Sequence, residues 1–166
     1  MSTEMLANQL QLTDYILKRN LEGLTHADSV KQPVAGNNLN WVVGHIVRTR
    51  NNVLGLVGAE PLYPREQFDA YEVEALTDTS KAIQFEELLD KFDTLQKPLV
   101  DGVRKLTPEV LAQPAPFSPS NNPNETIGSL LSAVVFHESY HIGQTGLLRR
   151  LAGKPGVIKS PEAVAS

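Results

Sequence analysis

The spacing of apolar residues restricts the fold of this chain more than any other feature of its sequence. Over four long segments, apolar side chains recur at steps of three and four residues, which places them on one face of an α-helix. The predicted helices cover residues 3–26, 39–57 and 82–105, and a fourth runs from NETIG (124–128) to AGKPG (152–156). No segment shows the alternating pattern of a half-buried strand. The sequence therefore predicts an all-α protein, with an antiparallel-type four-helix bundle as the leading architecture.

Turn-forming and helix-breaking residues separate the four segments. Long connections, rich in proline, glycine and polar residues, are predicted between the second and third helices and between the third and fourth. Thr107 and Pro108 can start one short helical turn in the latter connection. Pro98 lies inside the third predicted helix, where it removes one backbone hydrogen bond, so we expect a bend there.

Composition limits the classes of function. The chain has 166 residues, 41% of them apolar, which suits one domain over 1–166, with an ordered core at about 3–153 and a tail at 154–166. The net charge is −4 and lysine and arginine form no dense run, so nucleic acid is not an expected partner. We expect a cytoplasmic location without membrane contact, because no segment reaches the roughly 20 apolar residues of a bilayer span and no export signal begins the chain. The chain has no cysteine, which leaves histidine and carboxylate as metal ligands.

Two histidines interrupt the apolar face of the fourth predicted helix. Its inward positions are Ile127, Leu130, Val134, His137, His141, Leu148 and Leu151. Helical residues four apart rise by about 6 Å and point the same way, so His137 and His141 can both bind one ion. In the alternative interpretation each imidazole is only hydrogen-bonded in a partly buried slot, but burying two neutral rings without partners is costly. The spacing favours a metal site.

His45 is the natural third ligand, because it lies beside the apolar face of the second predicted helix. For this residue alone, a metal-binding role and a purely structural role are equally open. His26, beside Asp28 in the first connection, has no partner at metal-ligand spacing and is excluded.

The segment HESYH (137–141) has the letters of a zinc peptidase helix, in which the glutamate is the catalytic base. The longer peptidase motif needs a histidine at the position of Leu147. The only carboxylate side chain after His141 is that of Glu162, in the tail, and no sheet edge is predicted that could hold a peptide. Glu138 is also turned about 100° from His137 around the helix. We therefore expect no peptidase.

Two stretches, LNWVVGHIVRTRNNVLGL (39–56) and HESYHIGQTGLLRRLAGKPG (137–156), strongly resemble the DinB/YfiT-like metalloenzyme family, also called the DinB superfamily. The resemblance covers nearly the whole chain. It implies a four-helix bundle with up-down-down-up connections, and a divalent metal bound by one histidine of the second helix and an HxxxH pair of the fourth. His45, His137 and His141 match these positions. Family members often form homodimers. Characterised relatives include transferases of thiols such as bacillithiol, mycothiol or glutathione, a thiol-dependent isomerase, and metal-dependent hydrolases.

Three neutral histidines leave an ion its double charge and at least one open coordination position, which is typical of a catalytic site. Such an ion activates either a bound thiol or a bound water. We expect nickel or zinc, with iron, manganese or cobalt also compatible, and a low-molecular-weight thiol as a possible cosubstrate. Glu138, Tyr140 and Gln144 are the candidate catalytic helpers, although each can instead pack or face solvent.

Other residues near the motifs carry weaker functional signals. Three arginines can reach a substrate carboxylate but are better interpreted as solvated helix surface: Arg48, Arg149 and Arg150. Trp41 is expected in the core or in the pocket wall. Three aromatic residues of the second connection either line a pocket or cover it: Tyr63, Phe68 and Tyr71.

The predicted function is that of a divalent-metal-dependent transferase of a low-molecular-weight thiol, acting on a small molecule as a homodimer. A metal-dependent hydrolase is the first alternative, because the same geometry serves water. A non-catalytic protein that binds metal or a small ligand is the second.

Overall fold

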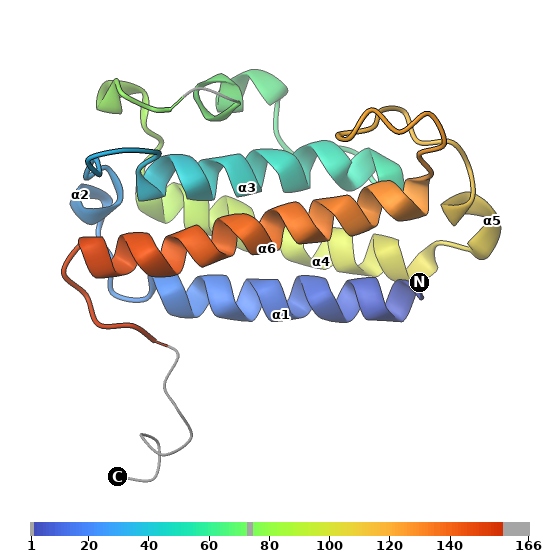
Figure 1. The fold of residues 1–166 in the computed structure, drawn as a ribbon, viewed down its shortest axis with the longest axis horizontal. Helices are drawn as coiled ribbons and strands as arrows, with labels where there is room; N and C mark the ends of the chain where they lie inside the picture. Colours follow the sequence, from blue (N-terminus) through green and yellow to red (C-terminus); the bar gives the residue numbers. More distant parts are fainter. Residues whose placement is uncertain (1, 73–74, 158–166) are drawn as a thin grey trace, which may run out of the picture.

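The computed structural model describes residues 2–72 and 75–157, and within these ranges all the regular secondary structure elements are helices (Figure 1). The all-α class predicted from the sequence is confirmed. Four long helices lie side by side: α1 (Thr3–Leu21), α3 (Leu39–Val53), α4 (Phe85–Lys105) and α6 (Ile127–Leu151). The connections hold the short helices α2 (His26–Ser29) and α5 (Pro108–Leu111) and the 3-10 helices η1 (Leu54–Val57), η2 (Arg65–Tyr71) and η3 (Thr79–Lys81).

Each long helix packs against two others. Both α1 and α3 contact α4 and α6, so the four helices enclose one core. Figure 1 shows that α1 and α6 run in one direction along the long axis, whereas α3 and α4 run in the opposite direction. The 3-10 helix η2 lies against α3. Across the described ranges, no helix combines the length and apolar character that a bilayer crossing requires.

Capping side chains explain where several of the helices begin. The side chains of Ser2, Asn38 and Thr126 each accept a hydrogen bond from the backbone N–H three residues further on, at the starts of α1, α3 and α6. The predicted first helix, 3–26, is too long, because Thr25 starts α2 with a capping box of its own. The last four residues of the predicted second helix form η1.

The third predicted helix continues through its proline. Pro98 cannot donate to the carbonyl of Thr94, but Thr94 is exposed, so water can satisfy the freed group. The N-terminus of α4 has no cap from its own neighbouring side chain, and the backbone N–H of Phe85 instead donates to Nδ1 of His26, at 3.2 Å. His26 therefore has a structural contact away from the other histidines.

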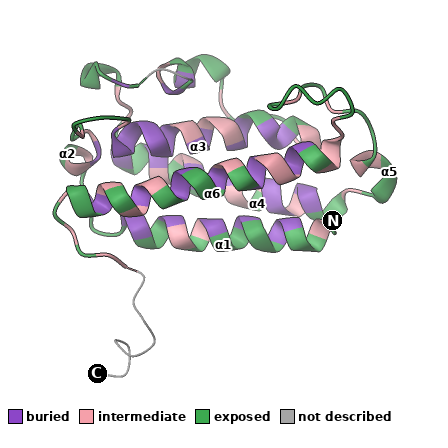
Figure 2. Cartoon of the chain, in the orientation of Figure 1, coloured by how far each residue is buried: buried purple, intermediate pink, exposed green. Residues whose placement is uncertain are grey.

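The buried faces follow the predicted helical periodicity in most places (Figure 2). On α1, residues spaced at steps of three and four form one buried face, which ends with Leu24 just beyond the helix: Leu6, Leu10, Thr13, Leu17, Asn20 and Leu24. On α6, Leu130 and Val134 are buried, but Leu151 is 64% exposed and lies outside the core. The inward set predicted for α6 is therefore wrong at its C-terminal end.

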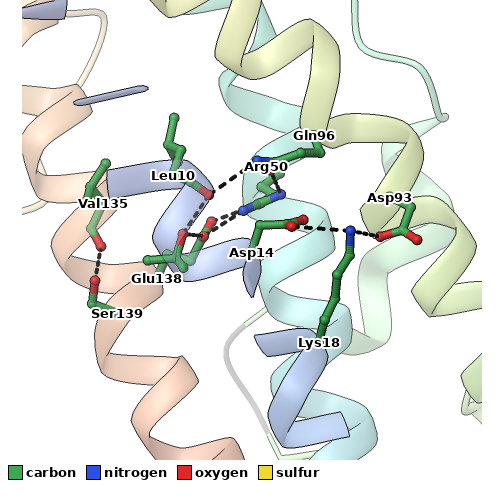
Figure 3. A network of polar contacts seen from close by, with 10 residues as sticks. Leu10, Asp14, Lys18, Arg50, Asp93, Gln96, Val135, Glu138 and Ser139 are labelled. Carbon is green, nitrogen blue, oxygen red and sulfur yellow. Dashed lines mark hydrogen bonds and ion pairs between the residues drawn. The ribbon is translucent and has the colours of Figure 1, made fainter. Parts of the chain in front are cut away.

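A buried ion pair joins the long helices (Figure 3). The guanidinium of Arg50 on α3 is fully buried and donates to both carboxylate oxygens of Glu138 on α6, at 2.8 and 2.7 Å. It also donates to the Gln96 side chain of α4 and lies 3.9 Å from the ring centre of Phe92. The hydroxyl of Thr13 on α1 donates to Glu138. Both charges are thus satisfied by partners, which offsets much of the cost of removing them from water.

We predict that Arg50→Met lowers the free energy of unfolding by about 3–5 kcal/mol, because the Glu138 carboxylate is left buried without a countercharge. Urea denaturation followed by circular dichroism measures the change. The control is Lys97→Met, which removes an exposed ion pair with Asp101 on the same α4 that Arg50 contacts. Lys97→Met should change the free energy of unfolding much less than Arg50→Met does. An equally small effect of both variants would contradict the stabilising role of Arg50.

Candidate metal centre

Two helices bring the three predicted ligands together. His45 lies on α3, and His137 and His141 lie one turn apart on α6. Nε2 of His137 is 3.2 Å from Nε2 of His45 and 3.1 Å from Nε2 of His141. One ligand atom from each ring lies within 4.8 Å of the other two. The three imidazoles therefore converge on one small volume.

In two of these histidines, a hydrogen-bond acceptor lies next to Nδ1, the ring nitrogen that points away from the other imidazoles. Nδ1 of His45 is 2.8 Å from the backbone carbonyl oxygen of Tyr71, and Nδ1 of His141 is 2.8 Å from Oε1 of Gln144. A carbonyl oxygen can only accept, so the proton of each ring is on Nδ1 and the lone pair is on Nε2. Both lone pairs face His137.

His137 cannot satisfy both lone pairs. With its proton on Nε2 it donates to only one neighbour, and with its proton on Nδ1 it donates to neither. A cation between the rings satisfies all three nitrogens. Nitrogens bound to one ion at about 2.1 Å lie about 3.0 to 3.4 Å apart for octahedral to tetrahedral angles, close to the separations from His137. The donor set therefore fits a divalent metal.

Burial lowers the pKa of all three imidazoles. Desolvation, with smaller effects from the neighbouring His141 and His45, lowers the pKa of His137 to about 4. Desolvation also lowers the pKa of His45 and of His141, although the hydrogen bonds to Tyr71 and Gln144 act in the opposite direction. All three rings are therefore neutral at pH 7. The neutral ring is the form that binds a metal.

Aromatic rings pack against two of the histidines. Trp41, one turn before His45 on α3, is 4% exposed and stacks on the His45 ring with centroids 4.7 Å apart and planes at 13°. Tyr140 packs edge-to-face on the His141 ring, with centroids 5.2 Å apart and planes at 79°, and is 59% exposed. Trp41 thus forms an inner wall beside the histidines, and Tyr140 lies at the solvent side.

The three predicted helper residues lie in different surroundings. Gln144 contacts His141, and Tyr140 packs on the same ring from outside. Glu138 is 2% exposed, and its carboxylate is engaged by Arg50 and Thr13 among the long helices. Its carboxylate therefore has its partners in the core and does not face solvent.

The arginines also differ from one another. Arg48 forms an ion pair with Glu72, the residue after η2. Arg150 is exposed, in agreement with the sequence. Arg149 is 7% exposed and donates to the backbone carbonyls of Asn20 and Glu22 at the end of α1, so the solvated position predicted for it is wrong.

Sequence reasoning missed two residues that support the site. The carbonyl of Tyr71 holds His45, and a backbone acceptor 26 residues away leaves no signal in the sequence. Arg50 did leave a signal in the sequence, because it occupies the same helical face as the buried Ile46 and Val53. A charged side chain on a buried face needs a partner of opposite charge.

Three histidines that converge from two packed helices form an arrangement that could hold a metal ion, as facing helices do in other helical proteins. The model of the DinB superfamily matches residues 9–145, and the chain belongs to that superfamily. A conserved protein from Enterococcus faecalis is similar in structure, with a TM-score of 0.73 over 93% of this chain and 99% of that one. Its sequence identity is 18%, so this likeness supports the fold alone. No curated protein matches the chain.

Proposed function

We propose that the chain is a divalent-metal-dependent enzyme that binds its ion through Nε2 of His45, His137 and His141. The carrying observation is the convergence of these nitrogens, of which at least one has no proton donor. Three protein ligands leave room for an exogenous one. Nickel or zinc suits imidazole ligands best, and iron, manganese and cobalt are also compatible.

The proposal includes the architecture of the family. We assign the four long helices to a bundle with an up-down-down-up order, which is supported by their packing pairs and by the directions seen in Figure 1. A single domain with an ordered core at about 3–153 stays a prediction, as does a cytoplasmic location. The tail residues 158–166, including Glu162, lie outside the described residues.

The favoured reaction is transfer of a low-molecular-weight thiol to a small electrophile. A divalent ion supplies charge that lowers the pKa of a bound thiol or water, so that a nucleophile forms near neutral pH. The thiol must come from outside, because the chain has no cysteine. In this proposal Gln144 holds the His141 ring, and Tyr140, which is 59% exposed and packs on that ring, donates to a substrate through its hydroxyl. For Glu138, the bonds to Arg50 favour a structural role over catalysis.

Exposed apolar side chains support the proposal of a homodimer. Val34, Leu62 and Phe117 lie elsewhere, but besides Tyr140, six of the exposed large apolar residues lie on two packed helices, α1 and α6: Met5, Leu12, Tyr15, Phe136, Leu147 and Leu151. By contrast, most of the large apolar side chains of α4 are buried in the core. On α6, the only charged residue before Arg149 is the buried Glu138, so its solvent face is uncharged over most of its length. Such a surface is suited to cover by a second copy.

Metal binding can be measured through the single tryptophan, because Trp41 stacks on His45. We predict that Ni²⁺ quenches its fluorescence with saturation at one ion per chain. His45→Ala and His141→Ala should each weaken binding by more than about 100-fold, beyond the loss typical of an outer partner. His26→Ala is the control and should bind like the wild type, since His26 contacts the start of α4. Wild-type affinity in His45→Ala would remove this residue from the site.

The pH dependence of the same titration follows from the lowered pKa values. Affinity should change little between about pH 8 and 7, above the ordinary imidazole pKa, because burial lowers the pKa of all three rings and keeps them neutral there. It should fall as the pH approaches the His137 pKa of about 4, where protons compete with the ion.

A screen of metal-loaded protein separates the candidate reactions. With glutathione or a related thiol and an aryl halide, a transferase consumes thiol, whereas His141→Ala and chelator-treated protein do not. Ester cleavage without any thiol indicates the hydrolase. Tight metal binding without turnover of any pair favours the non-catalytic binding protein.

Sedimentation velocity tests the dimer. We predict that the wild type sediments as a dimer at micromolar concentration and that Leu147→Glu shifts it to a monomer, because a charge is buried without a partner. Leu62→Glu, also at an exposed leucine but away from α1 and α6, should remain dimeric. A monomeric wild type would remove the dimer from the proposal.

A further inference from the structure

The carbonyl group that holds His45 belongs to a fully buried residue outside the long helices. Tyr71 is the last residue of η2, and its side chain is 0% exposed. Its hydroxyl donates to Oδ1 of Asn40 on α3, at 2.8 Å, and accepts from the backbone N–H of Ile83, at 2.7 Å. Asn40 also donates to the carbonyl oxygen of Ile83, at 2.9 Å. The phenol is therefore fixed at both of its hydrogen-bonding functions.

Gly44 provides the space in which the Tyr71 ring lies. A Cβ atom at position 44 would stand 2.2 Å from Cδ1 and 2.3 Å from Cε1 of that ring. The ring thus packs directly on the α3 backbone, at the residue that precedes His45. It cannot move aside easily, because it is buried and its hydroxyl is held by Asn40.

We propose that Tyr71 and Gly44 are positioning residues of the metal site. Together they hold the Tyr71 carbonyl where it accepts the Nδ1 proton of His45, which sets the tautomer and the ring orientation and keeps Nε2 available to an ion. The inference rests on the proposed metal-binding function. Partners of this kind typically change metal affinity by about 10- to 100-fold when they are lost.

A second anchor holds the same segment independently of Tyr71. Oδ1 of Asn51 accepts from the backbone N–H groups of Leu62 and Tyr63, at 2.9 and 3.1 Å, and its amide donates to the Tyr63 carbonyl, at 2.9 Å. Loss of the Tyr71 hydroxyl therefore loosens the end of the segment nearest His45 and leaves the other end attached. This makes a conservative substitution informative.

The experiment compares Tyr71→Phe with two controls in the full chain. We expect Tyr71→Phe to weaken Ni²⁺ binding by about tenfold, and Gly44→Ala to weaken it further by displacing the ring. Tyr63→Phe should bind like the wild type, because the Tyr63 hydroxyl makes no hydrogen bond to the described residues, while its ring packs on Phe68. Val103→Ala, which opens a core position on α4, controls for a general loss of stability.

Imidazole NMR of the metal-free protein gives a readout that a merely structural role does not move. Two-bond proton–nitrogen spectra should show His45 protonated at Nδ1 in the wild type, Tyr63→Phe and Val103→Ala. In Tyr71→Phe, the fraction protonated at Nε2 should rise. The signals of the His45 ring are assigned as those that are missing from the spectrum of His45→Ala.

Wild-type affinity and an unchanged tautomer in Tyr71→Phe would overturn the inference, as would an equal loss of affinity in Val103→Ala. These outcomes are distinguishable from failure of the proposed function. If the wild type binds no metal, the metal proposal fails, but the tautomers of the metal-free variants still decide whether Tyr71 positions His45.

Discussion

The pairing of Arg50 with Glu138 fixes how α3 and α6 lie against each other, and the candidate site depends on that alignment. An apolar interface of leucines and valines tolerates several offsets at similar free energy, whereas a two-pronged guanidinium–carboxylate contact has one geometry. Arg50 follows His45 on α3, and Glu138 is the neighbour of His137 on α6. A slip of one helical turn, about 5.4 Å, would break the ion pair and separate His45 from the other two rings. One buried contact therefore aligns both helices.

Polar contacts behind each histidine continue this arrangement. Asn20 of α1 donates to the Ile142 carbonyl and to the Thr145 hydroxyl, which holds α6 immediately beyond His141. Gln144 then orients the His141 ring itself. The protein's own side chains therefore hold both α6 and the His141 ring in place.

The helices and the histidine pair were predictable because both follow from local spacing. A period of three to four residues persists over many turns, and two side chains four apart on one helix face must lie together. His45 was predictable only as a candidate, since its meeting with α6 depends on how two separate helices align. That alignment depends on the pairing of the buried charges of Arg50 and Glu138, which lie 88 residues apart and share no local pattern.

The failures have a common physical cause, which is competition between a local pattern and a distant partner. The first helix stops early, and Thr25 caps a new one after it. Arg149 leaves the surface because the backbone carbonyls of Asn20 and Glu22 at the end of α1 accept hydrogen bonds from its guanidinium. The Tyr71 carbonyl is a contact of the same kind. Backbone groups are present at every residue, so composition and spacing cannot mark the one that is used.

The absence of a side chain at position 44 also limits how chains with this arrangement can vary. The Tyr71 ring occupies the space that a side chain at position 44 would need. A larger residue at position 44 therefore requires a smaller one at position 71. A chain with a bulkier residue directly before the α3 histidine must have a smaller side chain at the position of Tyr71, or the segment that carries this position must shift outward. In the second case the backbone oxygen retreats from the imidazole, and a new acceptor, such as a carboxylate, has to take its place.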